Sequence, residues 1–181
     1  MAKTLQERIQ AAVQDGVAAR HEYFGSIGLQ DEQSLGPPAR EDELRQIEAR
    51  LKRQLPPSYR AFLSLYDGWK MIDGGLDLLS VSELLNGPQH AQIQEWQQQM
   101  WKAGDTVAAR SLVIGVSHIT PTRYLLDPET SDDGGEWQLV QHHKIVEAEV
   151  PSFLQWLEES VDEYRQLARM QGDDEDGGDD E

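Results

Sequence analysis

The chain has 181 residues, 38% of them hydrophobic, which is enough for one domain with a hydrophobic core. Its formal net charge of −17 disfavours nucleic acid and anionic lipid as partners and favours basic proteins. The absence of cysteine excludes disulfides, thiolate metal sites and cysteine nucleophiles. There is no apolar run of about 20 residues, and the N-terminal stretch MAKTLQERIQ lacks the apolar segment of a secretory signal. We therefore expect a cytoplasmic protein with no membrane contact.

The acidic residues are concentrated at the C-terminus. The last ten residues, GDDEDGGDDE, contain seven of the 33 acidic residues, yet the rest of the chain still carries ten more acidic than basic residues. We expect residues 169–181 to form a disordered acidic tail, either a solvating segment or an arm that contacts a partner.

Residues 1–38 are predicted to form an N-terminal helix and a connection. Thr4 and Glu7 have the spacing of a capping box, in which each side chain bonds the backbone amide of the other residue. Apolar residues then recur at helical spacing from Leu5 to Val17. The following stretch, SIGLQDEQSLGPPAR, is rich in turn-forming residues.

The segment LPPSYRAFLSLYDGW is predicted to be a corner between two helices. Leu55 precedes Pro56 and is therefore pushed to an extended conformation, which ends the amphipathic helix EDELRQIEARLKRQ. Pro57 suits the first turn of the next helix, where its missing N–H costs nothing. Gly68 is expected to take the left-handed position that closes this helix. Trp69 then lies outside the helix and is expected to be partly exposed.

The remaining elements predict an α+β fold. GLDLLS indicates a short strand, Ser80 and Glu83 a second capping box, and QIQEWQQQMW a helix. Three β-like runs follow, SLVIGVSH, TRYLLD and EWQLVQHH, and a closing helix begins near Ser152. Helices around a cluster of short strands favour a single domain over residues 39–168, with a mostly antiparallel sheet packed against helices.

The sequence contains few signs of catalytic chemistry. The sequence contains neither a phosphate-binding glycine loop nor a serine nucleophile elbow. His118 with His142 or His143 and Glu147 could approach one another as a metal site, but adjacent histidines on a strand point to opposite faces. We expect no enzyme activity, no metal and no cofactor, and keep a carboxylate or metal hydrolase as the third hypothesis.

Candidate partner-binding residues combine tryptophan with acidic neighbours. Tryptophan is enriched at interface hot spots, and an exposed ring among carboxylates suits a basic partner. The alternative is that each ring packs beneath a loop. The predicted set is Asp67, Trp69, Asp73, Asp77 and Trp101, with Asp132 and Asp133 in an acidic turn.

Three segments in order resemble the SUKH superfamily, which includes the fungal cell-wall-assembly regulator domain. The first is LPPSYRAFLSLYDGW, preceded by a helix with Ile47 and Glu48. The second is LVIGVSHITPTRYLLDPE, which is similar to the strand pair of the family, and the third is AEVPSFLQWLEE, which is similar to its closing helix. The resemblance runs from about Arg40 to Tyr164.

This resemblance implies an interaction module. Bacterial SUKH proteins are mostly immunity proteins that bind and neutralise a toxin, commonly a nuclease. Our leading hypothesis is an immunity protein that binds a cognate toxin with a basic surface; the alternative is a regulatory scaffold without a toxin, like the fungal branch. The glutamine-rich helix QIQEWQQQMW departs from the commoner family pattern and could set partner specificity. Both a monomer and a homodimer remain open.

Overall fold

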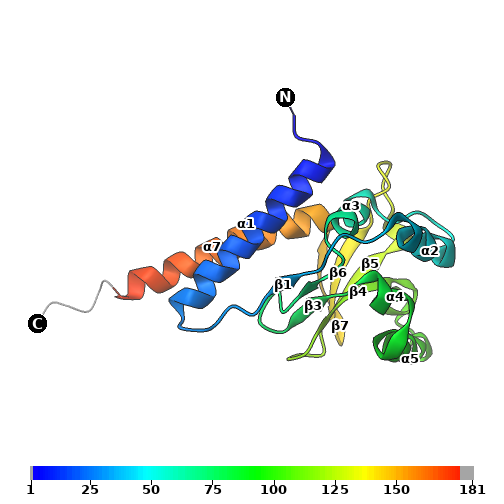
Figure 1. Cartoon of the computed structure of the whole chain (residues 1–181). Coiled ribbons are helices and arrows are strands. Elements are labelled where there is room, and N and C mark those ends of the chain that lie inside the picture. The colour runs from blue at the N-terminus through cyan, green and yellow to red at the C-terminus, as the bar shows by residue number, and fades with distance from the viewer. Residues whose placement is uncertain (1, 176–181) are drawn as a thin grey trace, which may run out of the picture.

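The computed structural model describes residues 2–175 (Figure 1). Within this range the helices are α1 (Leu5–Ser26), α2 (Glu41–Leu51), α3 (Pro57–Leu65), α4 (Val81–Leu85), α5 (Gly87–Ala103), α6 (Thr106–Arg110) and α7 (Phe153–Glu175). The strands are β1 (Ser34–Leu35), β2 (Trp69–Lys70), β3 (Leu76–Leu78), β4 (Leu112–Ser117), β5 (Arg123–Asp127), β6 (Gln138–His143) and β7 (Ile145–Val150). None of the helices in residues 2–175 combines the length and apolar character that crossing a membrane requires.

The strands form one antiparallel sheet in chain order from β1 to β7. Each strand pairs with the next along the sequence, so the α+β class with a mostly antiparallel sheet is confirmed. The predicted strands correspond to β3, β4, β5 and β6. The sequence did not predict β1 and β2 because two residues are too few for an alternating pattern to show; β7 and the short helix α6 were also missed.

Helices cover both faces of the sheet, as Figure 1 shows. Arg123 and Tyr124 are consecutive in β5 and therefore point to opposite faces. The Arg123 guanidinium lies 4.3 Å from the ring centroid of Trp96 in α5, whereas the Tyr124 ring packs at 5.5 Å from that of Trp156 in α7. Hence α5 lies on one face of the sheet, and α7 on the other.

The predicted helical corner is confirmed and lies in the core. α3 begins at Pro57, which occupies the first helical position. Tyr59 and Phe62 on the buried side of α3 both pack against Phe153 at the start of α7, with ring centroids 5.1 Å apart in each pair. These aromatic contacts join the corner to the closing helix.

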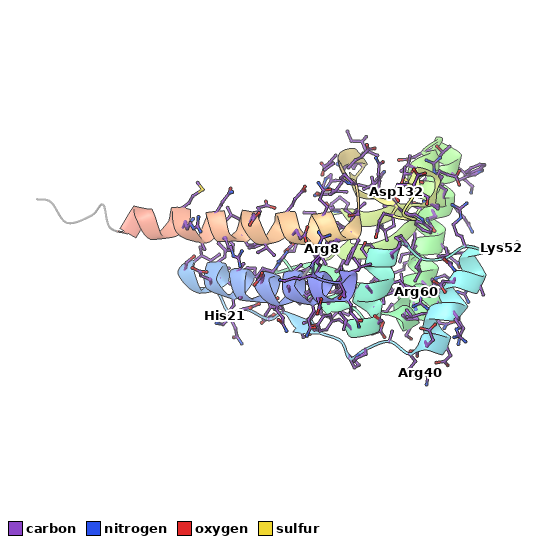
Figure 2. The ribbon with its side chains drawn as sticks, turned by 90° about the horizontal axis from the view of Figure 1, so that it is seen from above. Arg8, His21, Arg40, Lys52, Arg60 and Asp132 are labelled. Carbon is purple, nitrogen blue, oxygen red and sulfur yellow. The ribbon has the colours of Figure 1, made fainter. Side chains whose placement is uncertain are left out.

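The N-terminal helix is part of the same hydrophobic core. Its capping box at Thr4 and Glu7 is formed as predicted. Ile9 and Val13 are fully buried in the core shared with the sheet. α1 and α7 run side by side in the same direction (Figure 2), and Arg8 of α1 pairs with Glu158 of α7 at 2.8 Å. The segment 1–38 therefore contributes a helix to the core.

The closing helix is longer than expected. α7 continues to Glu175, so residues 169–175, which the sequence assigned to the tail, belong to a helix. The segment contains no proline, and each residue added to an existing helix gains a backbone hydrogen bond at a small entropic cost. Residues 176–181, the rest of the predicted tail, lie outside the described residues.

Candidate protein-binding surface

Trp69 is not exposed, which corrects the sequence-based expectation. Its exposed fraction is 0%, and its indole Nε1 donates a hydrogen bond to Gln33 Oε1 at 3.1 Å. The reason is that α3 ends at Leu65 and Trp69 lies in β2, between β1 and β3. Gly68 has a φ of 90° but does not cap α3; a Cβ there would lie 2.9 Å from the carbonyl oxygen of Leu78. The ring therefore enters the core.

Asp73 neutralises a buried cation. Its Oδ1 accepts a hydrogen bond from Arg20 Nε at 2.9 Å, and Arg20 is fully buried. The Arg20 guanidinium also lies over the rings of Trp69, at 5.2 Å, and Tyr164, at 4.4 Å. Buried charges need partners because the protein interior solvates them poorly. Asp73 thus helps to hold α1 and α7 on the sheet.

Asp77 lies in a network of hydrogen bonds. Its carboxylate accepts from the Met71 amide at 2.9 Å and lies 3.3 Å from Lys70 Nζ and 3.0 Å from His118 Nε2. Burial acts to raise the pKa of Asp77, but these donors together outweigh it, so its pKa lies below the ordinary aspartate value. Lys70 also contacts Glu83 at 2.7 Å.

Asp67 supports the start of α4. Its Oδ1 accepts a hydrogen bond from the Val81 amide at 2.6 Å. Burial raises the pKa of Asp67, and the Val81 amide opposes this shift. The segment Asp67–Asp77, which contains β2 and the turn into β3 and which we call the acidic loop, therefore has its three acidic side chains engaged within the fold.

Asp132 and Asp133 are exposed in the turn between β5 and β6, which agrees with an acidic turn. Asp132 Oδ1 accepts hydrogen bonds from the amides of Gly134 and Glu136, at 2.9 and 2.8 Å. Glu136 in turn accepts from the Ser58 amide at the start of α3. Figure 2 labels Asp132 in this turn, and Figure 1 shows the turn at the opposite end of the sheet from α5. The structure thus does not bring these aspartates together with Trp101.

Trp101 is exposed as expected. It lies near the end of α5 with an exposed fraction of 68%. Beside it is an open groove of about 520 Å³. The groove is lined by Gln94, Gln97, Gln98, Trp101, Lys102 and Ala109. We call this region, formed by α5 and α6 around Trp101, the α5 face.

The α5 face is poor in charge within an acidic protein. Glu95 and Lys102 are the two charged residues among the 17 of α5, which also contains six glutamines, and Arg110 is the charged residue of α6. Protein interfaces differ from the rest of the surface by depletion of charge at their centre and enrichment in tryptophan and methionine. This composition therefore distinguishes α5 from the remaining surface helices.

A second hollow continues from the groove. It has a volume of about 190 Å³ and lies between α5, α4 and β4, with mostly apolar lining that includes Leu84, Ile93 and Val113. Gln94, Gln97 and Ala109 line both hollows. The α5 face thus combines an exposed aromatic ring with an adjoining apolar recess.

Side-chain contacts hold the α5 face on the sheet. Gln97 Nε2 donates hydrogen bonds to the carbonyls of Ala108 and Ser111, at 3.2 and 2.7 Å, and so ties α5 to α6. Trp96 packs edge-on against buried His142 with ring centroids 5.4 Å apart. His142 Nε2 lies 2.8 Å from Asp105 Oδ2 in the turn between α5 and α6. A preformed surface loses less entropy on binding than a mobile one.

The histidines considered for a metal site have separate partners. His118 faces Asp77, His142 faces Asp105, and His143 Nδ1 lies 2.9 Å from Thr122 Oγ1. Among residues 2–175, no group of three or more histidine, aspartate or glutamate side chains is arranged to hold a metal ion.

A family model for SMI1 / KNR4 (SUKH-1) matches residues 38–168. This protein belongs to the SMI1 / KNR4 family. The resemblance seen in the three sequence segments is thereby confirmed. The SUKH-1 match covers the sheet from β2 to β7 and the whole α5 face, whereas α1 and β1 lie outside it. A search of curated proteins gave no match.

Within the SUKH-1 domain, the sequence pointed to Trp101 and to the glutamine-rich helix as a whole, but it did not single out the glutamines that line the groove. Gln94, Gln97 and Gln98 carry no charge and therefore were not among the candidate residues. The sequence did contain a signal for this surface, because a helix with only two charged residues among 17 is unusual in a chain with a net charge of −17. Counting charge per helix, as well as locating acidic clusters, would have directed attention to this surface.

Proposed function

We propose that this SUKH-1 protein is an immunity protein that binds and neutralises a cognate toxin in the cytoplasm. The observation that carries the proposal is the α5 face, where exposed Trp101 stands on a rigid, charge-poor surface of an otherwise acidic chain. Membership of the family is compatible with this role. Neutralisation occurs by stoichiometric contact, and no covalent step is involved.

In this proposal, the apolar contact area and the acidic charge of the protein have different roles in binding. Trp101 and the adjoining recess bury apolar area of the partner, which supplies most of the affinity. The acidic surface elsewhere on the chain, including Asp132 and Asp133 at the opposite end of the sheet, attracts a basic partner from a distance and raises the association rate. A nuclease is a fitting class of toxin, because its substrate groove is basic.

The test starts from capture of the partner by the tagged full chain in its native host, at low and high salt. We expect one basic protein in stoichiometric amount. Trp101→Ala should weaken its affinity at least about 30-fold, the size of effect expected for a hot spot. Met170→Ala is the matched control, since Met170 is an equally exposed apolar side chain on α7 and should leave the affinity unchanged.

A growth assay separates the immunity role from simple binding. The captured partner should arrest growth when expressed alone, and co-expression of this protein should restore growth, with Trp101→Ala failing to do so. Several unrelated partners without toxicity would contradict the proposal and favour the regulatory scaffold. Full rescue by Trp101→Ala would contradict the placement of the docking surface on α5.

A further inference from the structure

The strand β7 forms an open edge of the sheet. It pairs with β6 on one side only, from Leu139 opposite Val150 to His143 opposite Ile145. Within residues 2–175, no further backbone or side-chain hydrogen bond reaches residues 145–150 from elsewhere in the chain. An edge strand presents a row of N–H and C=O groups that another strand can pair with. The opposite edge, β1, has only two residues, so β7 is the larger of the two open edges.

The side chains of β7 lie on the surface. Ile145 and Val146 have exposed fractions of 70% and 36%, and Glu147, Ala148 and Glu149 are exposed as well. β-branched residues favour strand pairing, and these two are adjacent on a strand edge that is open. The charged residues of the strand are both acidic, and neither Glu147 nor Glu149 takes part in an ion pair within residues 2–175.

We propose that the edge of β7 binds an extended, lysine- or arginine-bearing segment of a partner protein as an eighth strand. Backbone hydrogen bonds to the edge supply general affinity, as in other cases of strand addition. Contacts with Ile145 and Val146 and ion pairs with Glu147 and Glu149 supply the preference for a segment that carries both apolar and basic residues. This surface is separate from the α5 face, and the proposal does not depend on a toxin partner.

The acidic residues of β7 disfavour a second copy of this chain as the added strand. Two paired β7 strands would bring four carboxylates to a strand spacing of about 4.8 Å, with no basic residue in either strand. Like charges across a strand pair are destabilising, whereas opposite charges are favourable. The register shift at Gln141 and His142 leaves Glu147 as an extra residue in β7. Such a bulge twists the edge and therefore suits a short segment better than a long flat one.

The test uses the full chain and a synthetic hexapeptide of alternating lysine and valine, followed by amide NMR. We expect shift changes centred on residues 145–150 and their β6 neighbours. A second peptide has two consecutive backbone amides N-methylated, which blocks both of its edges and leaves its charge intact; it should bind at least about tenfold more weakly. Equal binding of both peptides, or shifts spread over the acidic surface, would overturn the proposal.

Charge reversal provides the complementary test. Glu147→Lys together with Glu149→Lys should abolish binding of the lysine peptide and create binding of the corresponding glutamate peptide. The control reverses two exposed glutamates outside the sheet, Glu22→Lys with Glu32→Lys, and changes the net charge equally. We expect this control to retain the lysine peptide at residues 145–150. Loss of binding in both double variants would show that net charge alone governs the interaction and would overturn the proposal.

Discussion

The acidic loop Asp67–Asp77 and the α5 face each contain a tryptophan, but the two rings have opposite environments. Trp69 is buried between neighbouring strands and stacks with a buried arginine, whereas Trp101 projects from a helix beside an open groove. The loop is rich in carboxylates, and the helix is nearly free of charge. Of the two, the region with fewer acidic residues is the one that exposes its tryptophan.

The carboxylates of the acidic loop bind groups within the protein, and this explains why the loop does not offer a free acidic surface. Asp73 pairs with Arg20, Asp77 with Lys70 and His118, and Asp67 with a backbone amide. Each of these contacts is internal, so the acidic residues of the loop already have partners within the fold. A cluster of acids near an aromatic residue is therefore weak evidence for an interface until its internal partners are known.

The largest expected effect is a difference between the two tryptophans in how much stability is lost when each is replaced by alanine. Trp69→Ala should lower the free energy of unfolding by about 4 kcal/mol, because it empties a fully buried site. Trp101→Ala should change it by less than about 0.5 kcal/mol, since the side chain is exposed. Urea unfolding of both variants measures this contrast, and similar losses in the two would break the comparison.

A smaller loss of stability is expected when Asp73, whose carboxylate pairs with buried Arg20, is replaced. Asp73→Ala should lower the free energy of unfolding by about 2 kcal/mol, because it leaves the Arg20 guanidinium buried without its anionic partner. Asp133→Ala, in the exposed turn, is the control and should have little effect. Unchanged stability of Asp73→Ala would show that the loop carboxylates are free for other tasks.

The smallest effect concerns pH. Since the folded protein holds the pKa of Asp77 below its ordinary value, this residue stabilises the fold above about pH 4, and the contribution is lost as the pH falls through the lower folded-state pKa. Unfolding of the wild type and of Asp77→Asn at about pH 6 and about pH 3 should show a smaller loss for the variant. An equal loss would mean that other groups account for the acid sensitivity.

Much of the fold was predictable because local signals agreed with it. The capping boxes at Thr4 and Ser80, the proline corner and the apolar stripes of α2 and α7 all describe contacts within a few residues. Strand β2 was not predictable in this way. It consists of Trp69 and Lys70 and exists only because β1 and β3 lie on either side.

The candidate site was predictable only in part for the same reason. Exposure of Trp101 follows from its position beyond the apolar stripe of its own helix, which is local information. Burial of Trp69 depends on Arg20 and Gln33, which are 49 and 36 residues away in sequence. The partners of Asp73 and Asp77 are likewise set by the tertiary fold, so residue type alone could not distinguish structural from available carboxylates.

Hydrogen–deuterium exchange of the full chain, with and without its captured partner, tests most directly whether the α5 face is the docking surface. We expect the partner to slow amide exchange in residues 87–110, which form α5 and α6, and to leave residues 67–77 unchanged. Slower exchange in residues 67–77 with no change in residues 87–110 would contradict this expectation and return the binding site to the acidic loop.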